Sequence, residues 1–138
     1  MKDYKLDIET STLEFERWCD AMMIEYDESE ISEDGLASFN RYKKILLKAI
    51  RLGHLVISDF DEAVYTPFRP NSGHTSPITF KERKGSTLLA TDKRKESESA
   101  ARMYVALADM TGEHPNTFSK LSGMDITVCE AIFVLLMA

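Results

Sequence analysis

The chain has 138 residues, an ordinary hydrophobic fraction of 43% and a net charge of −6. At this length folding buries roughly two-thirds of the unfolded surface, so a core can form without disulfides or metals. The acidic balance argues against a broad nucleic-acid-binding surface. No apolar run reaches the roughly 18 residues of a membrane span. Because the start MKDYKLDIET is polar and the two cysteines lie far apart, we expect a cytoplasmic protein.

The charge is unevenly distributed along the chain. Residues 1–34 hold twelve acidic and three basic residues, whereas the rest of the chain holds 11 acidic and 14 basic residues. Such an asymmetry is typical of an acidic head that meets a basic partner. We favour the simpler interpretation, a solvated face that keeps the protein soluble.

Two helices are predicted in the first 53 residues. Apolar residues recur at helical spacing over 12–24. The acidic, Ser-rich stretch EYDESEISEDG follows and is typical of a loop. A second helix is expected over 33–52, with Ser32 as its cap and Gly53 as its left-handed end.

The pattern then changes to that of short strands. Residues His54–Ser58 and Ala63–Thr66 are rich in β-branched and aromatic side chains and flank the turn DFDE, which predicts an antiparallel hairpin. Ile78–Arg83 alternates and is a candidate third strand. A lone hairpin is marginal in water, so a third strand or a covering helix is expected.

Helical patterns return from Gly85 onward. Ser86 and Ser97 are candidate caps of two successive helices, Pro115 suits the first turn of a short third one, and Asp125 is a candidate cap of the last. We therefore predict an α+β fold, mainly helical, with five or six helices and a small hairpin or three-stranded sheet. Its expected regions are an acidic helical part, 1–53, and a hairpin followed by helices, 54–138.

Catalytic and metal-binding patterns are missing from the sequence. The three histidines and two cysteines show no CxxC, HxH or HExxH spacing. Asp59 and Asp61 form a DxD pair of the kind common in turns. KGST at 84–87 lacks the upstream glycine of a phosphate-binding loop. We predict no catalytic residue, metal or cofactor, and a protein that is not an enzyme.

The last predicted helix is apolar on nearly every side, from Ile126 to Met137. Such a helix is either buried in the core or covered by a partner. Methionines nearby would add adaptability to a binding surface. If the face is open, we expect self-association and client binding through these candidate partner-binding residues: Leu88, Leu89, Met103, Tyr104, Leu107, Ile132, Phe133, Leu136 and Met137.

Residues 77–138 resemble the tail assembly chaperones of long-tailed bacteriophages, especially the Mu-like group. The resemblance rests on a strand ending in FKER at 80–83, a small-residue turn at 85–89, a helix ending in MTG at 110–112 before Pro115, and Leu121 with Asp125 opening the final helix. A single proline stands where pairs are frequent, and the acidic N-terminal half has no counterpart.

The resemblance implies a protein that binds the long, aggregation-prone tape measure protein, keeps it soluble and assists assembly of tail tube protein around it. Such chaperones act in the host cytoplasm and are absent from the finished virion. Neither nucleic acid nor membrane is an expected partner. The alternative hypothesis is a small acidic adaptor or regulator that uses residues 1–34 to occupy a basic site on another protein.

Overall fold

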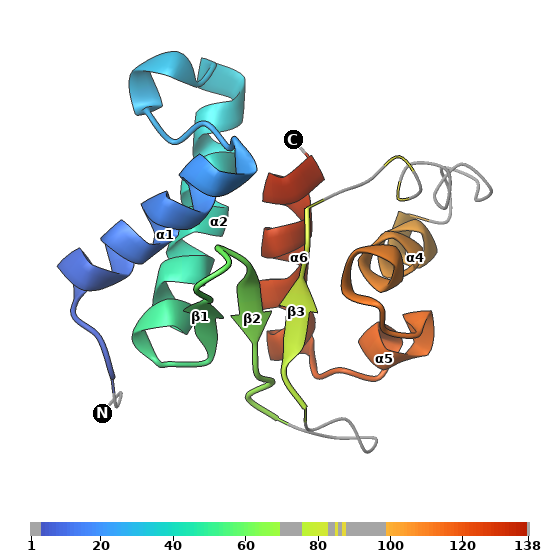
Figure 1. The fold of residues 1–138 in the computed structure, drawn as a ribbon. Coiled ribbons are helices and arrows are strands. Elements are labelled where there is room, and N and C mark those ends of the chain that lie inside the picture. Colours follow the sequence, from blue (N-terminus) through green and yellow to red (C-terminus); the bar gives the residue numbers. More distant parts are fainter. Residues whose placement is uncertain (1–3, 70–75, 83–84, 86, 88–98, 138) are drawn as a thin grey trace.

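The computed structural model describes residues 4–69, 76–82, 85, 87 and 99–137. Within these residues the fold is α+β and mainly helical, with five α-helices and one three-stranded antiparallel sheet, as predicted. Figure 1 shows α1 and α2 on one side of the sheet and α4 and α5 on the other. Helix α6 runs through the middle, behind the strands, and packs against α2 and α4.

Helix α1 spans Ile8–Met22 and begins one turn earlier than the apolar pattern predicted. The reason is Asp7, whose carboxylate accepts a hydrogen bond from the Thr10 backbone N–H at 2.7 Å. This N-cap satisfies a donor that the first turn leaves without an intrahelical partner. The helix ends at Met23, which adopts a left-handed conformation with φ of 59°.

Helix α2 spans Glu33–Arg51 and follows a short 3-10 turn, η1, at Glu28–Glu30. Ser32 caps α2 as predicted, because its hydroxyl accepts from the Gly35 N–H at 3.2 Å. At the other end Gly53 has the expected positive φ, 82°. A side chain at this position would be strained, so glycine makes the reversal into the sheet possible.

The sheet contains β1 (Leu55–Ile57), β2 (Ala63–Tyr65) and β3 (Ile78–Phe80) in the order β1-β2-β3. The predicted hairpin and third strand are therefore confirmed, each shorter than expected. Alternate side chains face the core, so each strand buries its first and third residue. Arg17 on α1 holds the hairpin turn, since its guanidinium donates to the carbonyls of Ile57 and Ser58 and to the Asp61 carboxylate.

The C-terminal helices are α4 (Ser99–Thr111), α5 (Pro115–Ser119) and α6 (Gly123–Met137). Pro115 opens α5 as predicted, and His114 caps it through Nδ1, which accepts from the Asn116 N–H at 3.1 Å. The caps expected at Ser86 and Ser97 lie outside the described residues.

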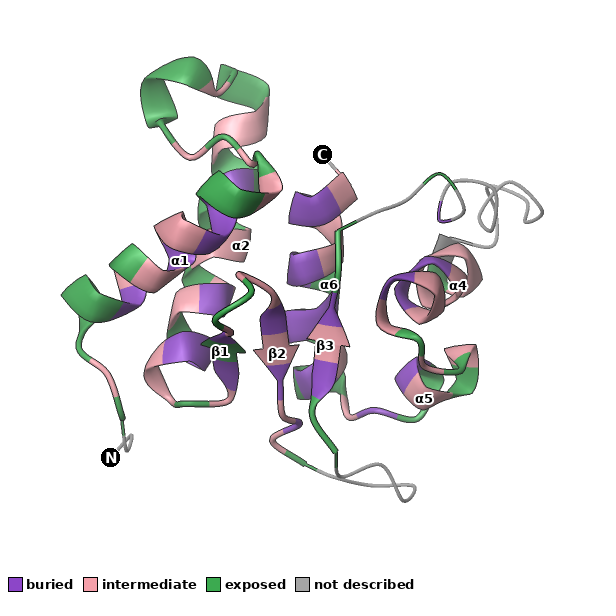
Figure 2. Cartoon of the chain, viewed as in Figure 1, coloured by how far each residue is buried: buried purple, intermediate pink, exposed green. Residues whose placement is uncertain are grey.

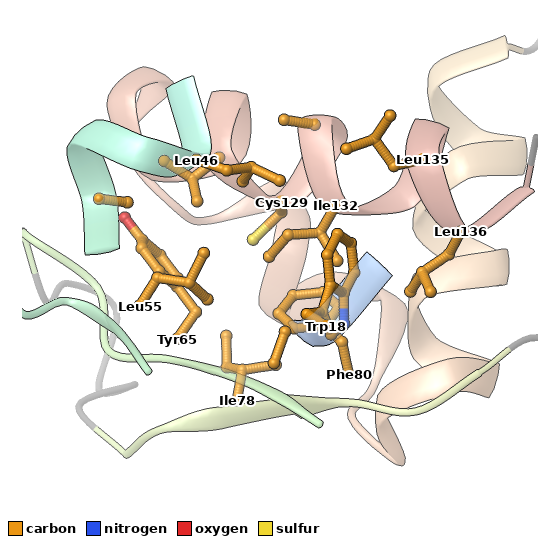
Figure 3. Close-up of a cluster of buried hydrophobic side chains, with 14 of the residues drawn as sticks. Trp18, Leu46, Leu55, Tyr65, Ile78, Phe80, Cys129, Ile132, Leu135 and Leu136 are labelled. Atoms are coloured by element: carbon orange, nitrogen blue, oxygen red, sulfur yellow. The ribbon is translucent and has the colours of Figure 1, made fainter. Parts of the chain in front are cut away.

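One hydrophobic core joins the two halves of the chain. Figure 3 shows Trp18 of α1 beside Phe80 of β3 and Ile132 of α6, with Leu46 of α2 on the other side of Cys129. These five side chains are each at most 1% exposed. The boundary expected at residue 53 coincides with the turn from α2 into β1, and side chains from both sides of it share this core.

A buried carboxylate fixes α6 against the sheet. Asp125 is fully buried and accepts hydrogen bonds from the Tyr65 hydroxyl at 2.6 Å and from the backbone N–H groups of Phe68 at 2.6 Å and Arg69 at 3.1 Å. The prediction that Asp125 caps α6 is wrong. Ser122 is the cap: its hydroxyl accepts from the Asp125 N–H at 3.2 Å and donates to the Asp125 carboxylate at 2.8 Å.

These contacts determine the ionisation of the pair. Burial raises the pKa of Asp125, but the hydrogen bonds from Tyr65, Ser122, Phe68 and Arg69 outweigh it, and the pKa lies below its ordinary value. Burial, together with the hydrogen bond to Asp125, raises the pKa of Tyr65 well above its ordinary value. The carboxylate is therefore ionised and Tyr65 is neutral at physiological pH, which suits a donor–acceptor pair.

We expect Asp125→Asn to lower the free energy of unfolding by about 3 kcal/mol, because the amide places its own N–H groups against donors. Urea denaturation at pH 7 measures this loss. Because folding lowers the pKa of Asp125, its stabilising contribution is present above the unfolded-state pKa of about 3.9 and disappears as the pH falls through the lower folded-state value. The difference between the two proteins should shrink below about pH 4. Equal stability at pH 7 would contradict the assigned role.

Candidate functional site

The apolar residues of the terminal helix lie mostly inside the protein. Leu107 and Ile132 are fully buried and Leu136 is 7% exposed. Figure 2 shows α6 as largely buried between the sheet and the flanking helices. The sequence left two possibilities for α6, burial in the core or cover by a partner, and in the structure the helix is buried in the core.

The remaining candidates offer less exposed surface than the sequence suggested. Met103, Tyr104 and Phe133 are half-buried and pack against the core, and Met137 is also half-buried. Leu88 and Leu89 lie outside the described residues. Among the described residues, helix α6 and its neighbour α4 therefore present partly buried apolar side chains that pack against the core.

Ile132→Asp should unfold the protein, because a buried unpaired charge costs about 4 kcal/mol, a large share of the stability of a small domain. Far-UV circular dichroism and thermal melting report the loss. Thr127→Asp is the matched control, since Thr127 is an exposed residue of the same helix. A folded Ile132→Asp variant with an unchanged melting temperature would show that α6 is not a core helix.

The histidines have structural roles where the structure describes them. His54 Nδ1 lies 2.9 Å from the Thr66 carbonyl, and the ring stacks on Phe68 with a centroid separation of 3.7 Å. His114 caps α5, and His74 lies outside the described residues. Among the residues described, no three His, Cys, Asp or Glu side chains are grouped so that they could hold a metal ion.

Both cysteines are buried thiols. Burial, with the nearby charges of Asp20 and Glu16, raises the pKa of Cys19 to about 12. Burial also raises the pKa of Cys129, which points from α6 into the core. Thiols with raised pKa values are poor nucleophiles at neutral pH. Their surroundings are those of small core residues.

An apolar groove lies where the end of α1, the turn after it, α2 and the last turns of α6 meet. Its space is about 450 Å³. Phe39 and Leu135 are buried in its floor, and Met23, which is 93% exposed, stands on its rim. Apolar and aromatic residues make up most of the lining: Met23, Ile24, Ile31, Phe39, Tyr42, Val134 and Leu135.

Acidic residues border this apolar groove. Glu25 and Glu30 belong to its lining and to the acidic segment, which we define as residues 25–34. All six acidic residues of the segment are exposed, and the loop that carries them projects beyond the sheet, at the top left of Figure 2. An apolar depression with an adjacent anionic rim can receive apolar side chains of a segment that also carries basic residues.

The apolar groove was not predicted from the sequence. The terminal helix contributes to it through Val134 and Leu135, which were not among the candidates. Figure 3 shows that Leu135 and Leu136 leave α6 on different sides, and only Leu135 reaches the groove. The available signal was the placement of Ile24 and Ile31 inside an otherwise acidic loop.

Neither a protein-family model, nor a curated protein, nor a solved structure matches this chain. None of the helices in the described part is long and apolar enough to cross a membrane.

Proposed function

We propose that this protein is a phage tail assembly chaperone that binds the tape measure protein, keeps it soluble and assists the assembly of tail tube protein around it. It acts in the host cytoplasm, stays out of the finished virion and has no enzymatic activity. The resemblance of residues 77–138 supports the client's identity. The apolar groove supports the mode of binding.

The apolar groove suits a helical client for two physical reasons. Burial of apolar side chains is favourable regardless of their exact sequence, which a chaperone of a long client needs. The exposed thioether of Met23 has a flexible, polarisable chain that can fit differently shaped neighbours. The client's apolar stripe would occupy the groove while its basic residues approach Glu25 and Glu30.

The experiment is co-expression with tape measure protein fragments, followed by measurement of soluble fragment and pull-down. Met23→Asn should lower fragment recovery at least threefold, because it places a polar side chain on the rim and keeps a residue that tolerates the left-handed conformation. Met124→Asn is the control, since Met124 is also an exposed methionine and lies outside the groove.

Salt gives a second readout of the same complex. Binding through apolar burial should persist at about 1 M salt, where the screening length falls to about 3 Å. Equal recovery with the two methionine variants, or no capture of any tape measure fragment, would refute the proposed function.

The adaptor hypothesis is favoured by a different observation, the exposure of all six acidic residues between 25 and 34. A carboxylate-rich projecting loop can occupy a basic cleft on another protein. In that case client capture would disappear at about 1 M salt and would be unaffected by Met23→Asn. The pull-down therefore separates the two functions.

A further inference from the structure

Helix α2 separates charge along its length. The acidic segment leads into its first turn and holds six acidic and no basic residues. Residues 41–51, which form its C-terminal half, hold five basic and no acidic residues. Its 19 residues correspond to a length of about 28 Å. Figure 1 shows the acidic loop and the last turn of α2 at opposite ends of this helix.

The basic end of α2 forms a second groove against the start of the chain. This basic groove has a space of about 630 Å³. The Arg51 guanidinium lies over the Tyr4 ring, 3.9 Å from its centroid, and covers one end of the groove. Exposed Lys44 and Lys48 stand along it. Its full lining is Tyr4, Ile8, Asn40, Lys43, Lys44, Leu47, Lys48 and Arg51.

The basic groove combines cations with exposed apolar surface. Ile8 is 49% exposed, and Leu47 and Tyr4 add apolar area beside the ammonium groups. A polyanion without apolar groups would leave this area uncovered. A carboxylate-rich peptide with apolar side chains would satisfy both features. The acidic segment is such a peptide, with Tyr26 and Ile31 within it and exposed Met23 two residues before it.

We propose that the basic groove of one copy receives the acidic segment of a second copy. The acidic segment and the basic groove lie toward opposite ends of α2, so the segment of one copy does not reach the groove of the same copy. The net charge of −6 opposes nucleic acid as the occupant, whereas a second copy brings the matching acidic loop with it. The basic groove shares no lining residue with the apolar groove, whereas the acidic segment supplies Glu25, Glu30 and Ile31 to the lining of the apolar groove.

The geometry makes the contact head-to-tail. Each copy keeps a free acidic segment at one end and a free basic groove at the other, so further copies can add. Association should therefore increase with protein concentration and should weaken as salt screens the charges. An interface through buried apolar surface would show no such loss with salt.

The test is sedimentation velocity of the full chain without client, at about 0.1 M and about 1 M salt, where the screening length is about 10 Å and about 3 Å. We expect oligomers at the lower salt and at least tenfold weaker association at the higher one. Lys44→Glu with Lys48→Glu changes the charge of the groove lining from +4 to 0. Glu28→Lys with Glu33→Lys changes the charge of the acidic segment from −6 to −2. Each double variant alone should sediment as a monomer. The control is Lys120→Glu, an exposed position at the C-cap of α5 that should leave association unchanged.

Mixing the two double variants gives the decisive result. The unchanged segment of one variant then meets the unchanged groove of the other, so the mixture should form a heterodimer. Circular dichroism establishes that both variants fold. A monomeric wild-type protein at the lower salt, or a mixture that stays monomeric, would overturn the proposal. So would groove-dependent binding of a DNA duplex in fluorescence anisotropy with no self-association. Client capture remains a separate readout, because Lys44→Glu with Lys48→Glu alters no residue of the apolar groove.

Discussion

The arrangement of the described chain depends on one buried carboxylate. Asp125 lies at the start of α6, yet its hydrogen-bond donors include Tyr65 in β2 and the backbone that follows β2. An ionised carboxylate in the interior is costly unless several donors surround it, and here four groups do so. A shift of α6 along the sheet would move Asp125 away from Tyr65 and from the backbone N–H groups after β2. The hydrogen bonds to Asp125 therefore orient α6 against the sheet, which its apolar faces alone would not do.

That orientation matters because α6 is apolar nearly all round. Hydrophobic burial favours many rotations of such a helix about equally, since it is roughly proportional to area. With Asp125 fixed at one end, Ile132 turns toward the sheet and Leu135 toward α2 and the apolar groove. The binding surface that we infer is thus a consequence of how α6 is oriented. Its position could not be deduced from the hydrophobicity of the helix alone.

Local signals in the sequence predicted most of the elements. Ser32 and Gly53 marked the ends of α2, and the hairpin followed from β-branched residues around a turn. The features that the sequence did not predict are contacts between residues that are distant along the chain. Asp125 resembled a helix cap, since nothing in the sequence indicates that Tyr65, sixty residues away, donates to it. The apolar groove combines segments around Ile24, Phe39 and Val134, which only the tertiary fold brings together.

The apolar groove and the basic groove both include residues of α2, but they would bind through different physical forces. Near its start, Phe39 contributes apolar surface whose burial is insensitive to salt. Near its end, Lys44 and Lys48 contribute a field that reaches about 8 Å at physiological ionic strength. The net charge of the chain does not reveal this basic end, because the chain as a whole holds more acidic than basic residues. One helix can therefore carry a contact set by shape and another set by charge, because Phe39 and Tyr42 line the apolar groove whereas Lys44 and Lys48 line the basic groove.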